Sequence, residues 1–525
     1  MSQLTELRYA MSLRLSVQSV MLFLVVNCSL DSRACLGQLP PLRELITEVS
    51  EAHARYAAET DNQSVSCLMD IAEAQMLVGE STAALQTARL LDGFWRMAAL
   101  SSCAKIHLER TGKLLDLPQS FFLDDAAEET ERLLTVEMEY RQFRLETAKL
   151  LIRSGHQDLA KEYLPDDDGE LLTTTGLFDF NVETALHLLE AGRAEAARSH
   201  FQKITSLTQR YQTVRWGSSK DSFLRLAESC VAAGADESAI TCHETLGSLI
   251  DGWLKPDVLM AHSGTTEPDF RLGFEAGKLG RISSIRGDRK TAKREFSEAL
   301  MILKRARVAR KKDQKEFHDL ELRRYLNPLI QIGTWQLLSG LTESGKATLK
   351  KASNLTSKFH SELSRHAHRK DVAVAFREGG EFELADAEFL LIDSLYWQAS
   401  VLCDWADEYA ERQDAENASA LLRRAEELAT QMRKPSNRTS TLLDVAERWS
   451  HLGQRNNTLK CIDQAMEISE ATDSKQHHQE ISFCQIRVGE LESAYQTISG
   501  IDGLRFQLMP LGKLAKALAE RSIKD

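Results

Sequence analysis

Few residues in this chain have the types and the spacing that metal binding or catalysis requires. His366 and His368 are one residue apart, so on a helix their side chains would point roughly 200° away from each other and would not share a metal ion. His477 and His478 are adjacent and fail in the same way. The stretch 166–169 (DDDG) lacks the alternating ligands and the distant glutamate of a calcium loop, which predicts a solvated acidic turn.

The sequence motifs of common enzyme classes are also missing. The chain contains no HExxH, no CxxC pair, no phosphate-binding loop and no GxSxG. Isolated serine, histidine and aspartate residues are plentiful, but no spacing brings a catalytic set together. We therefore expect a protein that is not an enzyme, with no catalytic, cofactor-binding or metal-binding residues and no cofactor.

Composition favours a long helical array over one compact core. The chain has 525 residues, of which 43% are hydrophobic and 27% charged, and only 9 are proline. A chain of this length exceeds what a single core supports, and few prolines leave helices uninterrupted. The formal charge of -12 would repel nucleic acid, so no nucleic-acid partner is expected and any basic site must be local.

The stretch 269–308 predicts a helix hairpin. Apolar residues recur at helical spacing on both sides of a break at Gly287 and Asp288. Gly280 and Ala292 are small where the two helices should face each other, so the backbones can approach closely and Phe296 can fill the space beyond. One hairpin cannot bury its own apolar faces, which predicts stacking on similar neighbours.

The same spacing recurs along the chain. In each unit a small residue lies seven positions before a turn residue and another lies five after it, and an irregular unit surrounds Gly112. Ten units share this register, which predicts an array of helix hairpins. Their turn residues are Gly79, Gly155, Gly192, Gly234, Gly287, Gly340, Gly380, Gln413, Gly453 and Gly489.

Residues 64–522 resemble a degenerate tetratricopeptide repeat (TPR). The resemblance rests on Leu279-Gly280, Gly287, Ala292, Phe296 and Ala299, which match the family signature. It implies an all-α fold, an α-solenoid of antiparallel helix hairpins in a TPR-like superhelix. In that family the first helices line a concave face that binds a protein or peptide.

The resemblance also implies which residues face that partner. They follow the small residue of each first helix, and they alternate in charge without the lysine and asparagine set that clamps a C-terminal carboxylate in some relatives. The implied partner-binding residues are Glu73, Lys149, Glu228, Arg281, Asp407 and Glu447.

One segment is basic within this acidic chain. Residues 286–324 contain fourteen bases and seven acids, and the densest part is Lys304, Arg305, Arg307, Arg310, Lys311 and Lys312. The segment would suit an anionic partner, a polyanion or a membrane surface. The preferred interpretation is a solvated outer face of a long second helix, because no aromatic residues interleave with the bases.

A second recurring motif places an aspartate after an apolar residue and before an aromatic one. It occurs as LLDGFW (90–95), LIDGW (249–253), LIDSLYW (391–397) and GIDGLRF (500–506). The aspartate is expected to be an N-cap, with the aromatic residue in the first turn of the next helix. Packing between hairpins is the expected role of the aromatic residue, and a ligand platform is the alternative.

Residues 1–34 resemble a secretory signal. Arg8 and Arg14 precede the apolar run 20–26 (VMLFLVV), and Ser32-Arg33-Ala34 has the small-x-small form of a cleavage site. The run is shorter than the roughly 20 residues that span a bilayer. A secreted or periplasmic protein is expected, with an uncleaved membrane anchor or a cytoplasmic protein as alternatives. Membrane contact is expected only through this segment, if it is uncleaved.

The expected organisation continues with a helix or linker at 35–63 and a first subarray of repeats at 64–254. A linker at 255–268 and a second subarray at 269–525 follow, the latter ending in a capping helix. The oligomeric state is not predicted. The scattered cysteines are expected to be small buried residues of helices.

The expected function is a non-catalytic scaffold for protein or peptide interaction. One alternative is a helical-superhelix enzyme of cell-wall metabolism, which would need an added catalytic domain. The other is a cytosolic peptide-sensing regulator, which would need an effector domain.

Overall fold

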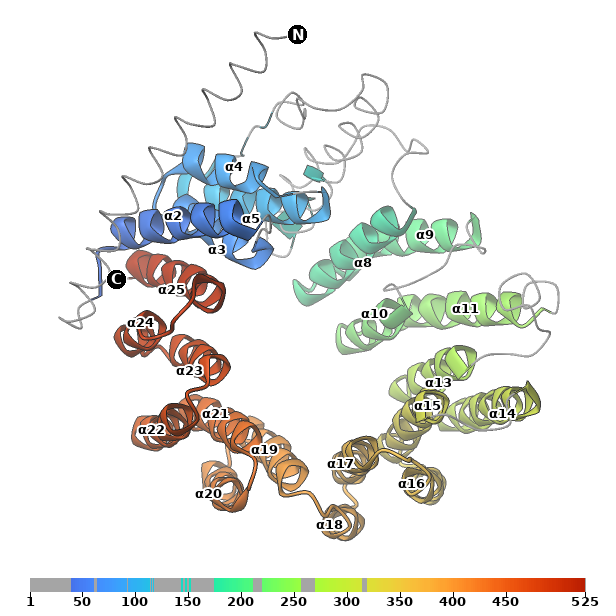
Figure 1. Ribbon diagram of the computed structural model, residues 1–525. Helices are drawn as coiled ribbons and strands as arrows, with labels where there is room; N and C mark the ends of the chain where they lie inside the picture. The colour runs from blue at the N-terminus through green and yellow to red at the C-terminus, as the bar shows by residue number, and fades with distance from the viewer. Residues whose placement is uncertain are drawn as a thin grey trace. The chain divides into compact units, whose positions relative to one another are not determined.

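The computed structural model describes residues 39–60, 64–91, 93–113, 115, 117, 143–144, 147–148, 151–152, 174–210, 220–255, 270–313 and 319–524. All regular secondary structure in this part of the chain is helical, and it contains no strand (Figure 1). It forms an all-α solenoid of antiparallel hairpins, which confirms the expected fold class. The signal segment, the turn at 166–169, Lys149 and nearly all of the 255–268 linker lie outside the described residues.

The chain divides into two compact units. Unit 1 comprises residues 1–116 and 429–525, and unit 2 comprises residues 117–428. The helices of unit 1 are α2 (Leu42–Thr60), α3 (Val65–Leu77), α4 (Ser81–Arg89), α5 (Gly93–Thr111), α21 (Pro435–His451), α22 (Arg455–Thr472), α23 (Lys475–Arg487), α24 (Leu491–Ser499) and α25 (Leu504–Lys524).

Unit 2 holds the remaining helices. They are α8 (Thr174–Glu190), α9 (Ala194–Arg210), α10 (Lys220–Ala232), α11 (Asp236–Trp253), α13 (Phe270–Ile285), α14 (Arg289–Asp313), α15 (Asp319–Leu338), α16 (Thr342–Thr356), α17 (Glu362–Glu378), α18 (Phe382–Leu390), α19 (Leu395–Glu411) and α20 (Ala415–Gln431), whose last residues extend into unit 1.

The predicted turn residues stand at the hairpin turns. Except for Gly155, which lies outside the described residues, all of them have a positive φ, from 61° at Gln413 to 91° at Gly79. Gly112 of the irregular unit does too, at 66°. Left-handed backbone conformation costs a residue with a Cβ atom but not glycine, so the recurring glycine is a direct consequence of the turn.

The hairpin of α13 and α14 packs as its small residues predict. A Cβ atom on Gly280 would lie 2.7 Å from the Phe296 ring, and Phe296 is fully buried. A Cβ atom on Gly273 of α13 would lie 2.5 Å from the Leu303 side chain of α14. The two helices are therefore as close as their side chains allow.

The turn at Gln413 yields a stability prediction. Gln413 has φ 61° where the other hairpins have glycine, and a residue with a Cβ atom pays roughly 1–2 kcal/mol for that conformation. Because glycine also loses more entropy on folding, Gln413→Gly should raise the free energy of unfolding by about 1 kcal/mol or less. Urea denaturation would measure it.

The equivalent turn in unit 1 gives the matched control. Gly453 has φ 71° with open space around its Cα, so Gly453→Gln should lower stability by a similar amount without a steric clash. Opposite signs at the two turns are expected, and a destabilising Gln413→Gly would contradict the explanation.

Three second helices are only nine residues long, and the junctions after them share one arrangement. These helices are α4, α18 and α24, and an apolar residue that follows each of them is buried. Its carbonyl oxygen accepts a hydrogen bond from a side chain of the next helix. The pairs are Leu91 with Arg96 Nε (2.7 Å), Ile392 with Gln398 Nε2 (2.6 Å) and Ile501 with Gln507 Nε2 (2.6 Å).

These junctions explain three of the four recurring aspartate motifs and correct the expected role of the aspartate in two of them. Asp92, which directly precedes α5, lies outside the described residues. The N-cap of α19 is Ser394, and α25 begins after Gly503, so neither Asp393 nor Asp502 is the capping residue. The prediction was also wrong at 249–253, which forms the last turn of α11. The motif recurs because its apolar residue must be buried and its carbonyl oxygen must be satisfied.

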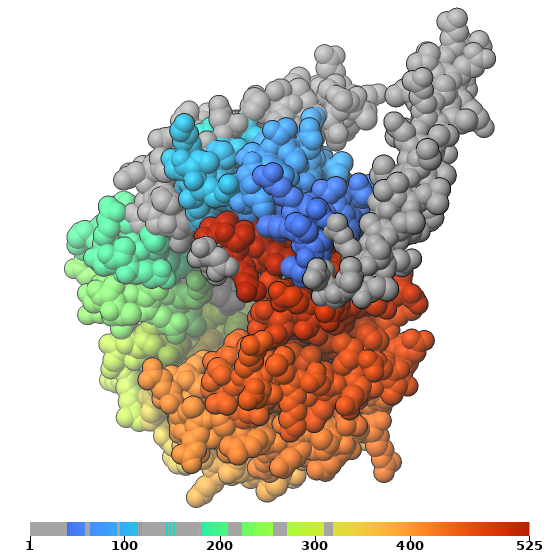
Figure 2. All heavy atoms as spheres, turned by 90° about the vertical axis from the view of Figure 1, so that its left-hand side faces the viewer, coloured from blue at the N-terminus to red at the C-terminus, as the bar shows by residue number. Residues whose placement is uncertain are grey.

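The first and the last of the described helices pack together inside unit 1. Helix α25 packs against α3 and α2, and Figure 2 shows the N-terminal helices directly against it. Leu508, Leu511 and Leu514 of α25 share one buried core with Cys67 and Ile71 of α3. Helix α25 therefore covers α2 and α3.

Candidate interaction surfaces

Four of the side chains predicted to bind a partner take part in ion pairs between neighbouring hairpins or helices. Within unit 2, Glu228 of α10 pairs with Arg281 of α13 (Oε1 to Nε, 3.5 Å). Within unit 1, Glu447 of α21 pairs with Arg487 of α23, and Glu73 of α3 pairs with Lys516 of α25. Asp407 is half-buried on α19. The structure therefore places the described members of the set on first helices, where most of them link neighbours.

Sequence reasoning missed further members of this series. Lys370 Nζ of α17 lies 2.9 Å from the Asp404 carboxylate of α19, and Arg377 Nε lies 2.7 Å from Glu408 Oε2. In α17, Lys370 stands three residues before the small residue Ala373 and Arg377 four after it. In α19, Asp404 and Glu408 stand two residues before and two after Ala406. None of them directly follows the small residue, which is the position that the resemblance implied. We call the surface that carries all these pairs the first-helix face.

Arg377 is the most enclosed cation of the first-helix face. It is 7% exposed, and its guanidinium lies 4.7 Å from the Trp405 ring centroid and 4.9 Å from that of Tyr409. The Phe382 ring centroid is 5.3 Å away. Aromatic faces attract a guanidinium. Arg377 therefore links the α17 and α19 hairpins in two ways, by its ion pair with Glu408 and by contact of its planar guanidinium with the α19 rings.

Other ion pairs of the first-helix face are partly open to solvent. The Glu228 and Arg487 side chains are 43% and 56% exposed. Exposed pairs contribute roughly 0–1 kcal/mol, so these residues define the charge of the surface more than its stability. At the deeper Asp70, burial raises the pKa of the carboxyl, and the ammonium groups of Lys513 and Lys516 oppose that shift.

A second series of ion pairs connects successive second helices. Arg198 of α9 lies 3.1 Å from Glu237 of α11 (Nη2 to Oε2), and Lys346 of α16 lies 2.9 Å from Glu381 at the start of α18. Arg455 of α22 donates two hydrogen bonds to Glu490, at 2.8 and 3.1 Å. Both layers of the array therefore use charge pairing between neighbouring hairpins.

The tertiary structure assembles one cluster of serine, histidine and glutamate. His243 Nε2 of α11 lies 2.8 Å from Glu295 Oε1 of α14 and 3.1 Å from Ser283 Oγ of α13. Ser283 Oγ donates to Glu295 Oε2 at 2.7 Å. A catalytic histidine uses one ring nitrogen for the serine and the other for the carboxylate, whereas here Ser283 and Glu295 both contact Nε2 of His243. Ser283 is also only 1% exposed, so this geometry does not activate the serine as a nucleophile. It joins three helices through a buried hydrogen-bond network.

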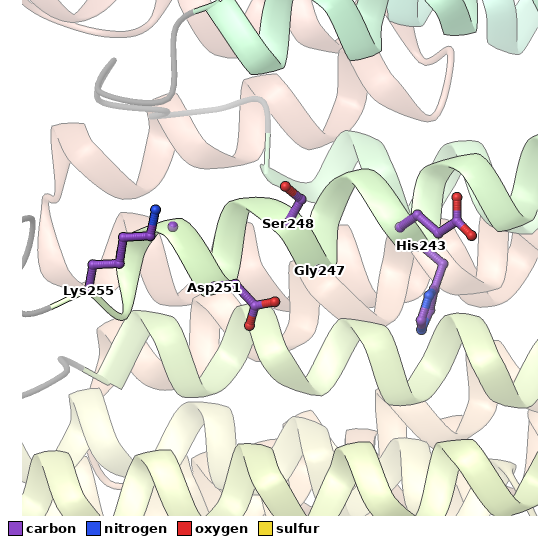
Figure 3. A pocket seen from close by; sticks show the side chains of 7 residues that line it. His243, Gly247, Ser248, Asp251 and Lys255 are labelled. Atoms are coloured by element: carbon purple, nitrogen blue, oxygen red, sulfur yellow. The ribbon is translucent and has the colours of Figure 1, made fainter.

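A hollow of about 470 Å³ lies along α11 beside this cluster (Figure 3). Its described lining comes from α11 and the residues directly after it: His243, Glu244, Gly247, Ser248, Asp251, Gly252 and Lys255. The His243 ring points toward the neighbouring helix and is already hydrogen-bonded there. The hollow therefore presents one helical wall and no convergent set of polar groups.

The basic segment forms the exposed side of α14. Lys304 and Arg305 are exposed, and the Arg307 guanidinium lies 4.8 Å from the Tyr325 ring centroid of α15. Arg310, Lys311 and Lys312 belong to the last turn of α14, but their side chains lie outside the described part. The same side of α14 exposes Met301 at 57% and Val308 at 50%.

Three of the four histidines singled out by sequence, His368, His477 and His478, have local hydrogen-bond partners. His368 Nδ1 lies 3.1 Å from Asp371 Oδ2 and the ring stacks on Phe359, whereas burial lowers the pKa of His366. His478 Nδ1 lies 2.8 Å from Ser469 Oγ. In the described residues no three histidine, cysteine, aspartate or glutamate side chains are grouped to hold a metal ion.

The cysteines behave as the sequence predicts. The seven that the structure describes are buried and free: Cys67, Cys103, Cys230, Cys242, Cys403, Cys461 and Cys484. Burial raises the pKa of the Cys67 and Cys103 thiols to about 12, so both remain protonated at neutral pH.

No helix in the described ranges is both long enough and apolar enough to cross a membrane. Comparisons with known proteins add little. No protein-family model and no curated protein matches the sequence, so the TPR resemblance receives no support beyond the repeated hairpins themselves.

Two solved structures illustrate the similarity found by fold. The crystal structure of Ton1535 from Thermococcus onnurineus NA1 is 14% identical, covers 71% of this chain and 98% of its own, and has a TM-score of 0.28. A circular tandem repeat protein with novel repeat topology and enhanced subunit contact surfaces is 15% identical, covers 92% and 98%, and has a TM-score of 0.25. Scores this low carry no argument about function.

Proposed function

We propose that this chain is a non-catalytic scaffold that binds a protein or peptide partner on its first-helix face. The observation that carries the proposal is the series of ion pairs between successive first helices, exemplified by Glu228 with Arg281 and Lys370 with Asp404. These pairs place charged side chains on neighbouring first helices, at α10 and α13 and at α17 and α19 in unit 2 and at α21 and α23 in unit 1. Charged surfaces that extend over several hairpins suit elongated partners.

The proposal includes export from the cytoplasm, which rests on the sequence of residues 1–34 alone. The mature chain is expected to begin at Cys35. Sequencing the N-terminus of the protein purified from its own host tests this part separately, and an N-terminus that retains the apolar run 20–26 would remove the cleaved form.

The binding proposal is tested by a charge swap that preserves the fold. In the double variant Glu228→Arg with Arg281→Glu, the ion pair can reform, but the sign of each surface position is reversed. Partner capture by the chain from residue 35, followed by binding measurements with the purified partner, should show at least a tenfold loss of affinity.

The second helices supply the matched control. Arg198→Glu with Glu237→Arg reverses an equivalent pair, at 3.1 Å, on the other layer of the same unit. This control should bind the partner as the unaltered chain does. Equal affinity for both double variants, or no saturable partner at all, would defeat the proposal.

A further inference from the structure

One edge of unit 2 carries three successive junctions between hairpins. Helices α14, α16 and α18 end there, and α15, α17 and α19 begin there. The Asp319 carboxylate at the start of α15 accepts the backbone N–H groups of His360 and Ser361, both at 3.0 Å, before α17. Arg369 of α17 donates to the Leu391 carbonyl oxygen after α18 and to Thr356 Oγ1 of α16. We call this edge, defined by the residues of the next two paragraphs, the junction edge.

The junction edge exposes large apolar side chains. Leu390 is 73% exposed, Leu363 66%, Leu320 58%, Val308 50% and Leu391 46%. These are five of the eleven most exposed large apolar residues of the described chain, and they stand on three successive junctions. Single exposed leucines are ordinary, but several gathered on one edge indicate an interaction site.

Basic side chains surround these apolar residues. They are Lys304, Arg305, Arg323, Arg324, Lys358, Arg365 and Arg369. Five acids lie among them, and three are within ion-pair distance of a base or histidine: Asp319 of His360 (3.3 Å), Glu321 of Arg324 (2.8 Å) and Glu362 of Arg365 (3.3 Å). The other two are Asp393 and Asp386, which is exposed one turn before Leu390. The edge is therefore net positive within a chain whose formal charge is -12.

We infer that the junction edge docks onto a membrane surface that contains anionic lipid. Leucine side chains at helix ends would enter the boundary of the acyl chains, and the flanking bases would meet the phosphates. The apolar residues stand on separate tips and not along one groove, which suits a fluid surface better than a peptide helix with fixed spacing between its anchors. This docking is independent of the proposed function, because it uses helix ends and not the first-helix face.

Vesicle flotation of the chain from residue 35 tests the inference. Binding is expected to vesicles of phosphatidylcholine with phosphatidylglycerol, to fall as salt rises, and to be absent with phosphatidylcholine alone. Leu320→Ser and Leu390→Ser should each lower the partition coefficient about tenfold, because each removes a leucine from the acyl boundary. Arg323→Ser should lower it about fivefold.

Helix α15 supplies the control at its other end. Leu338 is 48% exposed there, so Leu338→Ser removes comparable apolar surface away from the junction edge and should leave binding unchanged. All variants should have the same melting temperature as the unaltered chain, because every replaced side chain is exposed to solvent.

Three results would overturn the inference. They are no preference for anionic vesicles, binding that Leu320→Ser and Leu390→Ser leave intact, and a dimer in light scattering that the same two variants dissociate. The last result would assign the junction edge to contact between copies of this chain.

Discussion

Replacing Leu514 with aspartate should disrupt the packing of α25 against α2 and α3. Leu514 is fully buried in α25, within the core that α25 shares with α2 and α3. Burying a carboxylate there, in addition to losing the leucine, should cost more than 4 kcal/mol. Because this core is local to unit 1, the loss is expected to spread through unit 1 more than through unit 2.

Hydrogen exchange is the measurement that distinguishes this result from a frayed C-terminus. Amides of α2 and α3 should lose protection together with those of α25. These helices are distant in the sequence: Lys513 of α25 donates a hydrogen bond to Asp70 of α3, 443 residues away. Ile523→Asp is the control, because Ile523 lies on the same helix at 52% exposure and should leave exchange unchanged. Protected α2 and α3 amides in Leu514→Asp would mean that α25 does not support them.

Removing the charge of Lys278 should destabilise unit 2 by about 3–5 kcal/mol. Lys278 of α13 is 1% exposed, and its Nζ lies 3.1 Å from Oε2 of Glu275, which is 3% exposed. Lys278→Met would leave the Glu275 carboxylate without this buried counter-charge. Since water cannot replace the lost ammonium, the full cost of a buried charge falls on the folded state.

The double variant separates this cause from simple loss of packing. Glu275→Leu with Lys278→Met replaces the ion pair by apolar groups, so it should recover most of the stability and could exceed the original. Lys293→Met, at an exposed position of α14, should change the free energy of unfolding by less than about 0.5 kcal/mol. Denaturant titrations give all three values. Equal losses in the single and double variants would assign the effect to packing.

Local requirements made the hairpins predictable. A turn with φ near 70° favours glycine, and two backbones in contact need glycine or alanine at the crossing, so Gly287, Gly280 and Ala292 specify a hairpin without reference to the rest of the chain. Fixed offsets between such residues then identify the other units. The TPR family itself was not identified, because the same requirements apply to any close-packed helix pair.

Pairwise chemistry between hairpins could be predicted only in part. The position after each small residue does fall on the first-helix face, as Glu228 and Arg281 show. Arg377 and Glu408 reach that face from other offsets, because long side chains extend a full helical turn toward the next hairpin. The role of the aspartate motif was not predictable for a related reason. The motif recurs because its apolar residue is buried and the carbonyl oxygen of that residue needs a hydrogen-bond donor. The donors are Gln398 and Gln507 of the following helices, and only the tertiary structure places them there.

The sequence by itself determined the helices, their turns and the small contacts within each hairpin, since these depend on residues within about one repeat of each other. Only the tertiary structure decided that α25 covers α3 and that His243, Ser283 and Glu295 meet. It also decided that leucines and arginines gather where α15 and α17 begin. Such contacts join residues from different hairpins or from opposite ends of the chain, and helix periodicity carries no information about which apolar face packs against which.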